Sequence, residues 1–120
     1  MIIGYLEVLP LLVAACPSYG DSPHRAQADD DGEYLGVGHL VGHLIRLLDS
    51  GDTACFSGVF GVVEWVLEEG DDEARKLIVD GFYDDLTSPA FYVGANVSPG
   101  DFAPWFGPQS RKVPAVRRLL

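Results

Sequence analysis

Apolar residues recur at helical spacing through most of residues 33–86, and this feature limits the possible fold more than any other. Leu40, Leu44 and Leu47 follow one another at positions i, i+4 and i+7, which places them on one face of a helix. The pattern predicts a helix over residues 33–49. No segment of the chain sustains the alternation of apolar and polar residues that marks a half-buried strand, so we expect an all-α fold.

Two glycine–aspartate pairs divide the rest of this region into helices. Gly51 ends the helix over residues 33–49, and Asp52 is predicted to be the N-cap of the next helix, because its side-chain oxygen can accept a free backbone N–H. Gly70 is expected to end that helix in the left-handed conformation, and Asp71 to cap a further helix that closes at residues 87–89. Such short connections predict antiparallel helical hairpins of HEAT-like form.

The ends of the chain are predicted to add shorter helices. Residues 2–16 are expected to form a first amphipathic helix that ends at the proline opening a polar surface loop, residues 17–32. A connector over residues 87–98 precedes a short helix with Ser98 as its N-cap. In the tail, we expect either a kink at Pro114 or a helix that begins there.

The length of 120 residues fits one domain spanning residues 1–120, predicted to be a compact bundle of about five to six helices. Four glycines within the helical pattern are expected to let the second and third helices approach each other closely. These are Gly36, Gly42, Gly58 and Gly61.

The charge of the chain is strongly negative and unevenly distributed. The formal net charge is −10, and all 18 acidic residues lie between Glu7 and Asp101, while four of the eight basic residues lie in the last ten positions. Such a body repels nucleic-acid phosphates and attracts basic protein surfaces. The same excess of acidic residues can serve solubility alone, because composition does not separate solubility from attraction to a partner. As a binding surface, it predicts a protein partner with a basic surface and no nucleic acid. The candidate binding residues are Glu64, Glu68, Glu69, Asp71, Asp72, Glu73, Asp80, Asp84 and Asp85.

The N-terminal segment is expected to be part of the fold and not a secretion signal. No basic residue precedes its apolar run, which Glu7 and Pro10 interrupt, and no stretch of the chain has the length of a membrane span. This predicts a cytoplasmic protein with no membrane association. Cys16 and Cys55 are then expected to be reduced, and to pack as small hydrophobic residues.

No residue pattern in the chain is a strong catalytic signature, so we expect no enzymatic activity and no cofactor. His39 and His43 have the i, i+4 spacing that lets two imidazoles share a metal ion, which makes them weak metal-ligand candidates. A zinc site needs a third protein ligand, and a metalloprotease of the HExxH type needs a glutamate where this chain has Leu40.

Four stretches of the chain resemble a family of small uncharacterised bacterial proteins of unknown function. They are ACPSY (15–19), YLGVGHLVGHLIRLLDSGD (34–52), VFGVVEWVLEEGDDEARKLIVDGFYDDL (59–86) and FAPWFGPQSRK (102–112). The resemblance implies a mostly helical fold and no established activity, and some members of the family resemble immunity proteins of toxin systems. The chain departs from the family at Val113-Pro114, where the family pattern implies an aromatic residue and an unbroken helix.

These observations favour a binding module that neutralises or regulates a basic protein partner, such as a toxin, in the manner of an immunity protein or antitoxin. One alternative is a small metal-binding enzyme or sensor that uses His39 and His43. Another is a structural subunit that forms a homo-oligomer through an exposed patch at Trp65 or Trp105. The oligomeric state itself stays open.

Overall fold

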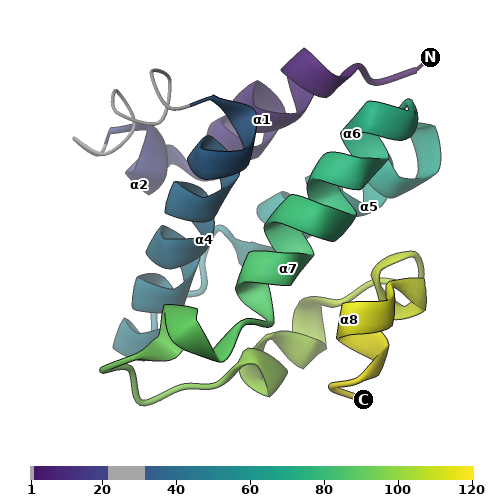
Figure 1. Ribbon diagram of the computed structural model, residues 1–120. Helices are drawn as coiled ribbons and strands as arrows, with labels where there is room; N and C mark the ends of the chain where they lie inside the picture. The colour runs from purple at the N-terminus through teal and green to yellow at the C-terminus, as the bar shows by residue number, and fades with distance from the viewer. Residues whose placement is uncertain (1, 22–31) are drawn as a thin grey trace.

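Three long helical segments form the body of the molecule, as seen in a computed structural model that describes residues 2–21 and 32–120. The third segment is continuous but passes from α-helix into a π-helical stretch and back. Helices α4 and α5 each pack against this third segment (Figure 1). The three are α4 (Glu33–Ser50), α5 (Phe56–Glu69) and α6–η1–α7 (Asp72–Lys76, Leu77–Phe82 and Tyr83–Leu86).

Shorter elements close the two ends of this body. At the N-terminus, α1 (Tyr5–Ala14) packs against α4, α5 and α6, and α2 (Pro17–Gly20) follows it. After α7 the chain folds into the short helices η2 (Pro89–Tyr92), η3 (Pro99–Trp105), η4 (Ser110–Lys112) and α8 (Pro114–Arg117). The C-terminal segment lies beside α7, and the chain ends far from its start (Figure 1).

An aromatic cluster holds the C-terminal segment against the helices. Phe60 of α5 lies at the centre, with its ring 5.8 Å from those of Phe82 and Phe102 and 5.9 Å from that of Phe106. Phe102 and Phe82 are fully buried, and burial of each such side chain contributes about 1.5–3 kcal/mol. The aromatic residues after Ser98 therefore dock the short C-terminal helices against α5 and the third segment.

The all-α fold is confirmed. Within residues 2–21 and 32–120 the backbone forms no β-strand, and a single bridge between Ile3 and Gly70 is the one β-type pairing there. The predicted 33–49 helix is α4, and the chain leaves it at Gly51, which has φ of 82°. Helix α8 begins at Pro114, which is one of the two predicted outcomes for the tail. None of the helices in the described part is both long and apolar enough to span a bilayer.

Two predicted helix ends were wrong. The third helix begins at Phe56 and not after Asp52, because Asp52 accepts the N–H of Ala54 and thereby caps a turn that precedes α5. Gly70 has extended backbone angles, φ −76° and ψ 151°, and is not left-handed. It pairs with Ile3 instead, and a Cβ on Gly70 would lie 2.5 Å from the carbonyl oxygen of Val66, so only glycine fits.

The prediction that the helix glycines let α4 and α5 approach each other closely was also wrong. A Cβ on Gly58 would meet the backbone of Ala15, next to α1, and a Cβ on Gly61 would meet nothing within 4 Å. Close approach to α4 occurs from the third segment instead, where the side chain of Asp85 lies over Gly38. The predicted loop over residues 17–32 begins with α2, and its residues 22–31 lie outside the described residues; η2 likewise forms within the 87–98 connector.

Candidate functional site

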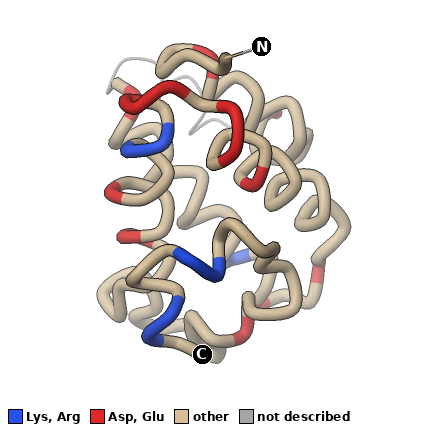
Figure 2. Tube along the Cα trace, turned by 90° about the vertical axis from the view of Figure 1, so that its right-hand side faces the viewer, with Lys and Arg blue, Asp and Glu red and all other residues tan. Residues whose placement is uncertain are grey.

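Most of the predicted acidic residues gather where α5 turns into α6. Figure 2 shows acidic residues around this turn, near the N-terminal end of the chain. All five acids of the turn are exposed to solvent. We call this set the acidic corner; it consists of Glu68, Glu69, Asp71, Asp72 and Glu73.

Backbone hydrogen bonds fix the shape of the acidic corner. The N–H of Ile3 donates to the carbonyl of Glu69 at 2.8 Å, and the N–H of Asp71 donates to the carbonyl of Ile3 at 2.9 Å. The carboxylate of Asp71 accepts the N–H of Ala74 at 2.8 Å, as expected of an N-cap. These bonds fix the backbone that carries the acids before any partner arrives, which lowers the entropic cost of binding.

The nearby basic residues leave the acidic corner negative. Arg75 forms an ion pair with Asp72 at 2.5 Å, and Lys76 follows it, so the corner and its next turn still carry more acids than bases. Both partners of that pair are largely exposed, and such pairs contribute at most about 1 kcal/mol. In the same view, the basic residues near the C-terminus lie in the lower half of the molecule, away from the acidic corner (Figure 2).

Apolar side chains adjoin the acidic corner. Trp65 is 40% exposed and precedes Glu68 and Glu69 by three and four residues on α5, which places the three side chains on one helix face. Ile2 is 72% exposed and is the neighbour of Ile3, the residue bonded to the corner. An exposed tryptophan beside charged groups is the composition of many binding hot spots.

The remaining predicted acids differ from one another in setting. Asp80 and Asp84 are exposed along the third segment, below the acidic corner. Asp85 is half-buried against α4, and this burial, reinforced by the charge of Asp84, raises the pKa of the Asp85 carboxyl to about 6. Asp85 therefore packs against α4 and does not belong to the acidic corner.

Glu64 is also turned inward, and it clamps the C-terminal segment. Its carboxylate accepts the N–H of Gln109 at 2.9 Å, the N–H of Ser110 at 2.7 Å and the hydroxyl of Ser110 at 2.6 Å. The Ser110 hydroxyl in turn accepts a hydrogen bond from the phenol of Tyr83. A Cβ on Gly107 would lie 2.4 Å from this carboxylate, so the glycine leaves the room that Glu64 occupies. We call this arrangement the Glu64 clamp.

The two histidines of α4 are not brought together with further ligands. Across residues 2–21 and 32–120, no group of three or more His, Cys, Asp or Glu side chains is placed to hold a metal ion. His43 Nε2 lies 2.9 Å from the hydroxyl oxygen of Ser18, and its ring lies 5.5 Å from that of Tyr19. His43 thus joins α4 to α2.

The two cysteines meet, although 39 positions separate them in the chain. The sulfur atoms of Cys16 and Cys55 lie 3.0 Å apart, and both residues are free thiols. Cys16 is fully buried and Cys55 is partly exposed. Sequence reasoning treated them separately, because no local pattern indicates that the end of α1 packs beside the start of α5.

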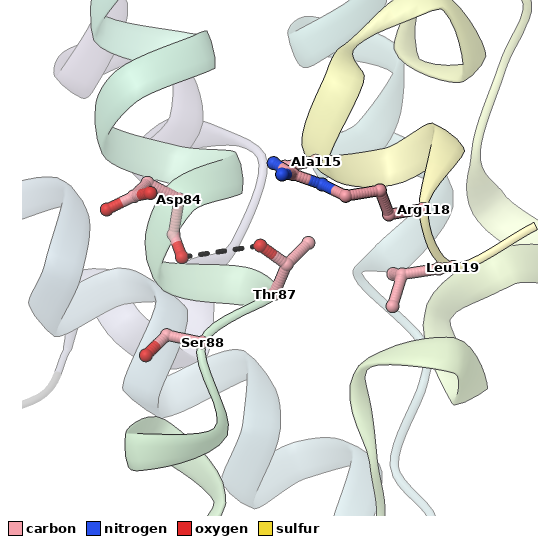
Figure 3. Close-up of a pocket in the computed structure, with 6 residues that line it drawn as sticks. All are labelled: Asp84, Thr87, Ser88, Ala115, Arg118 and Leu119. Atoms are coloured by element: carbon pink, nitrogen blue, oxygen red, sulfur yellow. Dashed lines mark hydrogen bonds between the residues drawn. The ribbon is translucent and has the colours of Figure 1, made fainter.

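A shallow cavity of about 340 Å³ lies between α7 and α8. Figure 3 shows the guanidinium of Arg118 reaching from α8 toward α7, while the carboxylate of Asp84 points away from the cavity. The Thr87 hydroxyl donates to the carbonyl of Asp84 at 3.4 Å and to that of Tyr83 at 2.8 Å. The lining of the cavity thus includes the Arg118 guanidinium and the Thr87 hydroxyl, which is already bonded to the backbone.

Comparison with known proteins matches most of the chain to a family. The model of a family described as a domain of unknown function (DUF7674) matches residues 9–117, from α1 to α8. No curated protein and no solved structure matches the chain.

Proposed function

The chain belongs to that family of unknown function, and we propose from its surface that it is a binding module whose acidic corner docks onto a basic protein. The observation that supports this is the exposed acidic corner, held rigid by Ile3 and bordered by Trp65. Exposed carboxylates attract an oppositely charged surface over long range and raise the association rate.

The proposed partner is a basic bacterial protein, such as a cytoplasmic toxin, which this protein neutralises in the manner of an immunity protein or antitoxin. An enzyme that binds nucleic acid presents a basic groove, because phosphate binding depends on Lys and Arg. An acidic, pre-formed surface can occupy such a groove directly.

The solvent exposure of the corner favours binding over catalysis. General acid–base catalysis needs a carboxyl in a cleft, where burial or a close neighbour shifts the pKa of that carboxyl toward neutral pH. The acidic corner lies on an open turn between two helices, where its carboxylates are solvated. Trp65 can supply the apolar anchor that such an interface uses at its centre.

The test is affinity capture from a lysate of the source organism with three forms of the protein. One variant neutralises the corner (Glu68→Gln, Glu69→Gln and Glu73→Gln). The matched control removes the same number of charges at residues 29–31 (Asp29→Asn, Asp30→Asn and Asp31→Asn). We expect the wild type and the control to enrich one basic protein, which the corner variant loses and which added salt weakens. Equal capture by both variants, or capture of no basic protein, would refute the proposal.

A further inference from the structure

The thiol pair is the strongest chemical feature outside the acidic corner. Cys16 is the N-cap of α2 and Cys55 is the N-cap of α5, and their sulfur atoms are in contact at 3.0 Å. Two thiols held this close need little backbone movement to bond to each other. Neither residue belongs to the surface that carries the proposed function.

The surroundings of Cys16 give its proton a route away from the sulfur. The hydroxyl of Ser18 lies 3.7 Å from the sulfur of Cys16 and 2.9 Å from His43 Nε2. A hydroxyl can accept one hydrogen bond and donate another at the same time. Ser18 can therefore accept the thiol hydrogen of Cys16 while it donates to His43.

We propose that Cys16 and Cys55 form a reversible intramolecular disulfide, with a small disulfide such as oxidised glutathione as the oxidant. The partly exposed Cys55 loses its proton and attacks the oxidant, which forms a mixed disulfide and releases one glutathione thiolate. The buried Cys16 then loses its proton and attacks the Cys55 sulfur, which releases the second glutathione thiolate. The protein loses two protons and two electrons, and two molecules of reduced glutathione form.

The setting of Cys55 indicates that the disulfide forms slowly. Burial, together with the neighbouring Cys16, raises the pKa of the Cys55 thiol to about 12, so little of it is thiolate at neutral pH. Such a pair suits a durable cross-link better than rapid catalytic exchange. The cross-link would join the end of α1 to the start of α5 and close a loop of 39 positions, which raises stability by restricting the unfolded chain.

The experiment incubates the reduced full-length protein with oxidised glutathione and follows free thiols, intact mass and the melting temperature. We expect monomers that lose both free thiols and two hydrogens, with a Cys16–Cys55 cross-link found by peptide mapping. The melting temperature should rise by about 10 °C and return to its starting value with dithiothreitol.

Single variants supply the control. Cys55→Ser and Cys16→Ala each keep one thiol, and should show no rise in melting temperature under the same treatment; the use of both guards against one failing to fold. Wild-type protein that keeps both thiols free, retains glutathione on each cysteine or forms only intermolecular dimers would overturn the proposal.

Discussion

The Glu64 clamp should contribute a large share of the protein's stability, and Glu64→Gln tests this. The carboxylate accepts three hydrogen bonds, at 2.6, 2.7 and 2.9 Å, from Gln109 and Ser110. A glutamine offers one oxygen, and its amide nitrogen must then face a backbone N–H, so at least one bond is replaced by two opposed donors. A bond to a charged acceptor contributes about 1.5–3 kcal/mol, and the others weaken with loss of the charge. We expect a loss of about 3 kcal/mol.

Urea denaturation at pH 7 measures this loss, with Glu68→Gln as the matched control. Glu68 lies one turn further along α5, is exposed, and loses the same charge on substitution, so its change should stay within about 0.5 kcal/mol. For a chain of this size, 3 kcal/mol corresponds to a fall in melting temperature of about 12 °C.

A double-mutant cycle with Ser110→Ala separates the clamp from general effects of charge. Because Ser110 and Glu64 share a hydrogen bond at 2.6 Å, we expect a coupling energy of at least about 1 kcal/mol. Equal stability of Glu64→Gln and Glu68→Gln, or a coupling energy near zero, would refute the reasoning.

Three further predictions concern single positions. Gly70→Ala should lower the melting temperature by an amount equivalent to more than about 2 kcal/mol, because its Cβ would lie 2.5 Å from the Val66 carbonyl oxygen. Gly61→Ala should raise the melting temperature slightly, because a Cβ at that position meets nothing within 4 Å. Asp71→Ala removes the N-cap bond to α6 and should cost about 1 kcal/mol in urea denaturation. The raised pKa of Asp85, about 6, means that the folded state binds the Asp85 proton more tightly than the unfolded state does. The free energy of unfolding should therefore fall as pH rises from about 4 to about 6. Asp85→Asn should flatten that fall, so that the variant gains on the wild type between pH 4.5 and pH 7; an unchanged difference at the two pH values would contradict this.

Local patterns predicted the parts of the fold that local physics decides. The apolar spacing of α4 and the glycine after it specify both a buried face and a stop, and the structure has Gly51 with φ of 82°. Asp71 caps α6 because a short acidic side chain reaches the N–H of Ala74 within its own turn. Such contacts span a few residues and can therefore be predicted from the sequence.

Contacts between segments that are distant in the sequence could not be predicted from local patterns. Glu64 was predicted to be one of the partner-binding acids, and only the fold of the C-terminal segment brings Ser110 to it. Gly70 ends α5 by pairing with Ile3, a choice that depends on where the N-terminus lies. The approach of Cys16 to Cys55 depends likewise on how α1 packs beside α5.

The central claim, that the acidic corner is the docking surface, is tested most directly by photo-crosslinking inside the source cells. A photoreactive amino acid replaces Glu69 in one form, and Val93, exposed on the connector after α7, in the other. The account predicts that position 69 forms an adduct with one basic protein and that position 93 does not. No adduct at position 69, or the same adducts at both positions, would contradict it.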